Sequence, residues 1–145
     1  MYSSIVVGTD GSDTACRAVS EATRLSKALG CELHLVSAYE PLRGTRVVGA
    51  PEEVAKTALP DSDVRAVVDE AAATVRLSGV AVSSHTVTGD PADALLAVAA
   101  EQAAGLIVVG SRGMHGMTRV LGSVPNKVSH HARCSVLIVA TEDAG

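Results

Sequence analysis

The sequence predicts an α/β protein built on an open, parallel, five-stranded sheet with helices on both faces. Short apolar runs rich in Val, Ile and Leu alternate with longer segments whose apolar residues recur every three or four positions. The first pattern is typical of strands buried on both faces, and the second is typical of amphipathic helices. Because strands and helices alternate throughout, we expect right-handed crossovers between parallel strands.

The first strand and the first helix are expected at the start of the chain. Residues 4–9 contain a short apolar run, and residues 13–29 carry Ala, Val and Leu at helical spacing. Ser12 or Asp13 can cap this helix, and Gly30 can end it.

The middle of the chain is expected to hold two strands, a helix and a long loop. Residues 32–39 and 80–88 are the expected second and third strands, and residues 61–78 are the helix between them. Residues 40–60 contain three prolines and two glycines and show little periodicity. We expect this segment to be a loop that can cover a site.

The last third of the chain is expected to add two helices and two strands. A third helix over residues 89–104 has Pro91 in its first turn, where proline is well tolerated. The fourth strand is residues 106–109, the fourth helix is residues 122–132 and the fifth strand is residues 135–140.

Composition limits the classes of protein to consider. The 145 residues suffice for one buried core, so we expect residues 1–145 to form a single domain. The formal charge of −4 and the lack of a Lys/Arg run argue against nucleic acid as the main partner. No apolar stretch is long enough to span a bilayer, and the N-terminus lacks the order of a signal peptide. Cys16, Cys31 and Cys134 are widely spaced, which favours reduced thiols in the cytoplasm.

Two glycine-rich loops follow expected strands. Gly8-Thr9-Asp10-Gly11-Ser12 follows the first strand, and Gly110-Ser111-Arg112-Gly113 follows the fourth. Glycines let backbone N–H groups approach a phosphate closely, and a following helix adds the positive end of its dipole. Ligands of open parallel sheets bind beyond the carboxyl ends of the strands, where the strand order reverses. If the first and fourth strands are neighbours, both loops face one crevice.

The candidate phosphate ligands lie in the second loop and just beyond it. The backbone N–H groups and one hydroxyl would come from Gly110, Gly113, Gly122 and Ser123. The alternative is an ordinary strand-to-helix loop. Arg112 and Arg119 could pair with phosphate or remain solvated loop charges, and Lys127 is expected at the surface.

The sequence offers no catalytic or metal-binding constellation. Gly105, Gly110 and Ser111 match the spacing of a Walker A loop but lack the lysine before the serine. His130 and His131 are adjacent on a helix and do not face one another, so we expect no metal site. No Ser/His/Asp or Cys/His arrangement can be assembled, and no catalytic residue is assigned.

Taken together, these segments resemble the universal stress proteins of the nucleotide-binding type over nearly the whole chain. The resemblance is carried by residues 5–12, by Gly89-Asp90-Pro91, by residues 110–124 and by residues 136–139. It implies the sheet order 3-2-1-4-5, a homodimer and a bound ATP or other adenine nucleotide.

The resemblance also implies roles for single residues. Gly8, Thr9 and Asp10 belong to its nucleotide-binding set, with Asp10 near the nucleoside, although Asp10 could instead help to cap the first helix. The backbone of Ala38 would meet the adenine edge. Val124 follows Ser123 in the matching phosphate loop.

One departure leaves the ligand open. Gly113 and Gly122 are separated by eight residues, one fewer than in the ATP-binding pattern of the family. ATP with Mg²⁺, AMP and cAMP therefore all remain candidates.

We expect a cytoplasmic sensor or regulator with an unidentified protein partner rather than a fast enzyme. The alternatives are a slow ATPase or phosphotransferase, for which Asp10 is the one good candidate, and a dimerisation module without a nucleotide. The apolar run Val136-Leu137-Ile138-Val139 lies at the sheet edge in the implied order. Because a bare apolar edge is an aggregation hazard, we expect it to pair with its own copy in a homodimer.

Overall fold

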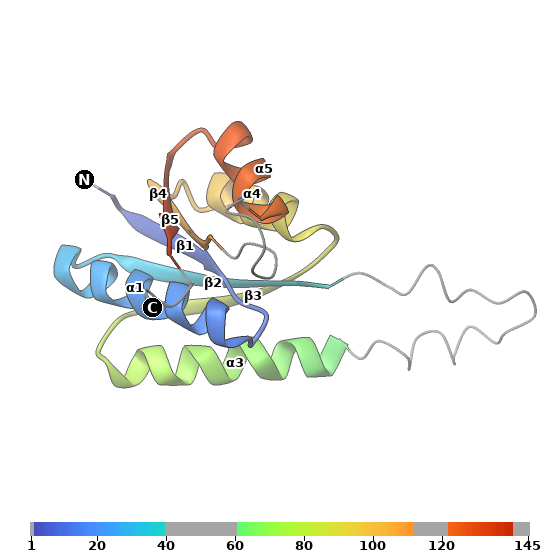
Figure 1. Cartoon of the computed structure of the whole chain (residues 1–145). Helices are drawn as coiled ribbons and strands as arrows, with labels where there is room; N and C mark the ends of the chain where they lie inside the picture. The colour runs from blue at the N-terminus through green and yellow to red at the C-terminus, as the bar shows by residue number, and fades with distance from the viewer. Residues whose placement is uncertain (1, 40–60, 112–121, 141–145) are drawn as a thin grey trace, which may run out of the picture.

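The computed structural model describes residues 2–39, 61–111 and 122–140 (Figure 1). In chain order the elements are β1 (Ser4–Gly8), α1 (Asp13–Leu29), β2 (Glu32–Tyr39), α3 (Asp61–Leu77), β3 (Val82–Thr88), α4 (Pro91–Glu101), β4 (Leu106–Gly110), α5 (Ser123–His131) and β5 (Ser135–Val139). The strands form one parallel sheet in the order β3-β2-β1-β4-β5, which confirms the expected fold class. Within the described residues, no helix is long and apolar enough to cross a membrane.

The central position of β1 determines where a ligand can bind. Ile5 of β1 pairs with Leu33 of β2 on one side and with Leu106 of β4 on the other. The strand order therefore reverses between β1 and β4, and the loops that follow these two strands leave the sheet at the same edge. This adjacency is the condition that the local sequence had left open.

Aliphatic side chains fill a core on each face of the sheet. Ile5 and Val7 point toward α1 and α3, whereas Val6 points toward α4 and α5. Figure 1 shows the two pairs of helices on opposite sides of the sheet. The alternation of β1 side chains between two buried faces explains why Ile5, Val6 and Val7 are all apolar.

The first helix begins and ends as expected. The hydroxyl oxygen of Ser12 accepts a hydrogen bond from the N–H of Ala15 at 3.2 Å, so Ser12 rather than Asp13 is the N-cap. At the other end, Gly30 adopts φ 68°, a left-handed conformation that suits glycine.

Helix α4 ends at Glu101, three residues before the expected end at residue 104. The cause is the backbone of Ala103, which has φ 52°. The N–H of Ala104 bonds the carbonyl of Ala99 at 2.9 Å, and the N–H of Ala103 bonds that of Ala100 at 3.3 Å. This is a Schellman ending with alanine where glycine is usual, so no glycine marks the end of the helix.

We predict that Ala103→Gly raises the free energy of unfolding by about 0.5–1 kcal/mol. Glycine removes the left-handed strain of about 1–2 kcal/mol from the folded state. It also increases the conformational entropy of the unfolded chain, which cancels only part of that gain. Urea denaturation of the purified variant measures the change. The control is Ala97→Gly at an exposed site inside α4, which should lower stability by about 1 kcal/mol. A loss of stability in Ala103→Gly would contradict the prediction.

A pair of histidines lies between β2 and β3. Nδ1 of His34 is 3.0 Å from Nε2 of His85, and the ring centroids are 5.1 Å apart. His34 is buried, and its Nε2 is 3.7 Å from Oε1 of Glu32. Burial and the neighbouring His34 lower the pKa of His85, against smaller opposing effects of Glu101 and Glu32. Because one ring must accept the shared hydrogen bond, the pair cannot take up a proton on both rings and stay bonded.

This pair predicts a loss of stability in mild acid. The unfolded chain protonates His85 near its ordinary pKa of 6.5, whereas the folded chain protonates it at lower pH. The stabilisation is therefore complete above that value and is lost as pH falls through the lowered pKa, with a slope of at most about 1.4 kcal/mol per pH unit. Urea midpoints at pH 7.5 and pH 5.5 should differ less in His85→Gln than in the wild type. His131→Gln, at an exposed histidine of α5, should follow the wild-type curve.

Candidate functional site

A cavity of about 190 Å³ lies at the carboxyl ends of β1 and β4, and we call it the crevice. Its walls come from these strands, from β2 and from the first turns of α1, α4 and α5. The lining residues are Gly8, Thr9, Asp10, Ser12, Thr14, Ala15, Ala18, Val36, Ala38, Pro91, Leu95, Val109, Gly110 and Val124. The crevice thus lies where the strand order reverses.

The structure brings together most of the residues that the sequence singled out. The predicted site residues that line the crevice are Gly8, Thr9, Asp10, Ala38, Gly110 and Val124. Gly122 and Ser123 do not line it, although they directly precede Val124 at the start of α5. The predicted residues Arg112, Gly113 and Arg119, and the expected loop at residues 40–60, lie outside the described residues.

The loop after β1 is held by one hydrogen bond to β2 and by two hydrogen bonds within the loop. The N–H of Thr9 donates to the carbonyl of Val36 at 2.9 Å, and the Thr9 hydroxyl accepts from the N–H of Gly11 at 3.2 Å. Oδ1 of Asp10 accepts from the N–H of Ser12 at 2.9 Å. Asp10 therefore shapes the turn that leads into α1 and also presents an exposed carboxylate at the rim of the crevice.

Gly8 lets α4 approach the end of β1 closely. A Cβ atom at Gly8 would lie 3.3 Å from Cδ2 of Leu95, which is tighter than ordinary contact. Leu95 is almost fully buried and forms part of the crevice wall. A side chain at position 8 would therefore push on this wall.

Helix α5 presents an uncapped N-terminus beside the crevice. Gly122 is its N-cap and offers no side chain, while α1 and α4 are capped by Ser12 and Asp90. The N–H of Gly122 donates to the carbonyl of Ser111 at 3.4 Å, and Pro125 has no N–H. The N–H groups of the first turn that lack a partner within the helix are therefore those of Ser123 and Val124.

Gly122 does not offer its backbone N–H to a phosphate as the sequence predicts. Its φ of −62° and ψ of 166° are open to any residue, so no special conformational freedom is required there. Its N–H is also engaged by Ser111 rather than directed at a ligand. What Gly122 retains is its small size at a buried position next to Ser123.

An ion cluster links the starts of α4 and α5. Nζ of Lys127 lies 3.3 Å from Oδ2 of Asp90 and 3.0 Å from Oδ1 of Asp93. Asp90 also accepts the N–H of Asp93 at 3.1 Å as the cap of α4. This backbone hydrogen bond and then Lys127 lower the pKa of Asp90, and the two carboxylates raise the pKa of Lys127. Lys127 is partly exposed as expected, but it is paired across two helices.

Several lining residues were missed in the sequence. The first turns of α1 contribute Thr14, Ala15 and Ala18 to the crevice. The sequence could have indicated them, because the helix begins directly after the first glycine-rich loop. Among the described residues, no group of three or more His, Cys, Asp or Glu side chains could hold a metal ion. Cys16, Cys31 and Cys134 are free thiols.

Comparisons with known proteins agree on one family. The profile of the universal stress protein family matches residues 1–140. A universal stress protein of Mycobacterium tuberculosis is 35% identical over 143 residues, which covers 97% of each chain.

Two solved structures resemble this chain and contain a nucleotide. One is a universal stress protein in complex with cAMP, which is 34% identical with a TM-score of 0.74 and covers 97% of this chain and 98% of its own. The other is the universal stress protein of Archaeoglobus fulgidus in complex with dAMP, which is 25% identical with a TM-score of 0.68 and covers 95% and 98%.

Proposed function

Because this chain belongs to the universal stress protein family, we propose that its crevice binds an adenine nucleotide and that the protein acts as a nucleotide-dependent regulator. The observation that carries the proposal is the convergence of two features on one cavity. The loop after β1 and the uncapped start of α5 both border the reversal point of the sheet.

We assign the apolar part of the crevice to the base. Ala38, Val36 and Leu95 give walls without charge, and the backbone at the end of β2 can meet the edge of adenine. Asp10 lies at the rim, where its carboxylate can accept hydrogen bonds from the ribose hydroxyls. This division matches the usual composition of small-ligand sites, which are mostly apolar with a few polar groups.

We assign the phosphate to the start of α5 and to the loop after β4. The N–H groups of Ser123 and Val124, the Ser123 hydroxyl and the helix dipole favour an anion at this end. Gly110, Arg112 and Gly113 belong to the same proposed cradle. AMP and cAMP are the favoured ligands because the two nucleotide-bound relatives hold cAMP and dAMP. ATP with Mg²⁺ is the second candidate.

The ligand carried by the protein tests this proposal. Small molecules released by denaturing the natively purified protein should include an adenine nucleotide, identified by mass spectrometry. Protein denatured after exhaustive dialysis is the control. Release of a non-nucleotide molecule from protein that does not bind added AMP after removal of that molecule would contradict the assignment.

We predict binding rather than rapid catalysis. Among the described residues that line the crevice, Asp10 has the one ionisable side chain, so hydrolysis lacks a second acid or base. ATP turnover should be far below the median enzyme rate of about 10 per second. A steady-state assay on rigorously purified protein measures it. Enzyme-like turnover that Asp10→Ala abolishes would favour the ATPase alternative.

We also propose a homodimer formed through β5. This strand is last in the sheet order and carries four consecutive apolar residues that are only half-buried in the single chain. Pairing with its own copy across a twofold axis would cover them. The dimer, the cytoplasmic location and a protein partner are all part of the proposed function.

A further inference from the structure

We infer that Lys127 tunes the crevice for anionic ligands by offsetting one of the two negative charges at the start of α4. The inference rests on the proposed function, because it concerns the affinity of the same crevice for nucleotides of different charge. Lys127 does not line the crevice and acts through Asp90 and Asp93, so it is a positioning residue.

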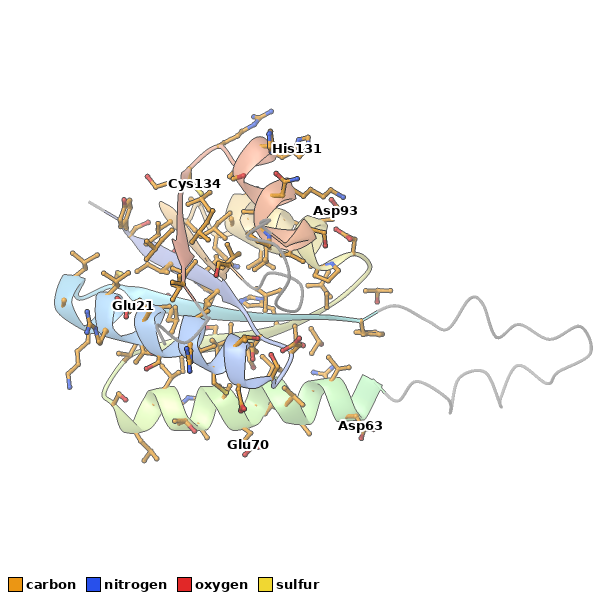
Figure 2. All side chains as sticks on the ribbon, viewed as in Figure 1. Glu21, Asp63, Glu70, Asp93, His131 and Cys134 are labelled. Carbon is orange, nitrogen blue, oxygen red and sulfur yellow. The ribbon has the colours of Figure 1, made fainter. Side chains whose placement is uncertain are left out.

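The three residues lie close along the chain to residues that line the crevice. Asp90 precedes Pro91, which lines the crevice from α4, and Asp93 follows Pro91 by two residues. Lys127 is one turn beyond Val124, which lines the crevice from α5. Figure 2 shows the labelled Asp93 at the end of α4 that lies beside α5. The cluster therefore spans the two helix starts that form one wall of the proposed phosphate end.

The carboxylates of α4 stabilise their own helix but oppose an anion next to it. Asp90 caps α4, and Asp93 lies in its first turn, where negative charge interacts favourably with the helix dipole. The same two charges repel a phosphate, since charges interact over about 8 Å at physiological ionic strength. Asp10 adds a third carboxylate at the rim.

Lys127 offsets this repulsion. Its ammonium contacts both carboxylates, at 3.0 Å and 3.3 Å, and brings the net charge of the cluster from two negative charges to one. Without it, a bound phosphate would face two uncompensated carboxylates. The penalty should grow with the charge of the ligand, whereas a purely structural tie between α4 and α5 would affect all ligands alike.

The test is Lys127→Met, which keeps much of the side-chain length and removes the charge. Affinities for cAMP, AMP and ATP, which carry increasing negative charge, are measured by calorimetry at low and high salt. We expect a loss of at most about twofold for cAMP and about tenfold for ATP at low salt, with the difference shrinking at high salt.

Two further variants separate local from general effects. Lys27→Met removes the same charge from the last turn of α1, far from the crevice, and should leave the three affinities unchanged. Asp93→Asn in the Lys127→Met background should restore ATP binding. Equal losses for all three ligands, or no loss for any, would overturn the inference while the proposed function stands. Failure of the wild type to bind any of the three would remove both.

Discussion

Replacing Ala38 by phenylalanine is expected to weaken adenine-nucleotide binding at least about 100-fold, a loss of about 2.7 kcal/mol. Ala38 lies near the end of β2 and lines the crevice, so a phenyl ring there occupies space assigned to the base. The fold should tolerate the change, because aromatic residues suit strands and the ring can enter the existing cavity of about 190 Å³. Isothermal titration calorimetry with AMP and cAMP measures the effect.

The matched control is Ala81→Phe. Ala81 is exposed and precedes β3, at the opposite end of the sheet from the crevice. It should keep the wild-type affinity. If Ala38→Phe were folded and kept the wild-type affinity for nucleotide, the crevice would not be the binding site.

The second large effect is expected at the outer edge of β5, where Val136→Pro should convert the proposed dimer to a monomer. The N–H of Ser135 donates to Gly105 at 3.2 Å, and the carbonyl of Val139 accepts from Ser111 at 2.8 Å. Alternate residues of β5 thus face β4, and Val136 directs its N–H outward. Proline removes that outward donor and leaves the bonds to β4.

Because the dimer has twofold symmetry, Val136→Pro removes the outward hydrogen bond at two places. The affinity of the two copies for each other should therefore fall by at least about 30-fold. Sedimentation velocity across micromolar concentrations measures the change, with circular dichroism to confirm the fold. The control is Leu137→Pro, which removes a donor that faces β4 and should destabilise the chain itself. Sedimentation of the wild type as a monomer would contradict the dimer.

Much of the fold could be predicted from local patterns, because the spacing of apolar residues in each segment indicates whether it forms a helix or a strand. The two-faced burial of β1 and the cap and glycine of α1 are readable in this way. The end of α4 could not be predicted in this way, because Ala103 adopts a left-handed conformation and an alanine in a sequence does not indicate one. The contact of His34 with His85 depends on the register of β2 with β3, which only the folded sheet defines.

The part of the candidate site that is formed by glycine-rich loops could be predicted from the sequence. Glycines at the ends of β1 and β4 indicated the crevice, and the structure brings Gly8 and Gly110 to the same cavity. The apolar contributions of Ala15 and Ala18 were not visible, because alanines of a helix carry no sign of which cavity they line. The pairing of Lys127 with Asp90 and Asp93 required the packing of α5 against α4.

Whether the crevice binds an adenine nucleotide can be measured by calorimetric titration of the wild-type protein, freed of any co-purified ligand, with cAMP, AMP and ATP. We expect saturable binding of at least one of these nucleotides at one site per chain, with a dissociation constant below about 1 mM. Absence of saturable binding for all three, in protein shown to be folded, would contradict it.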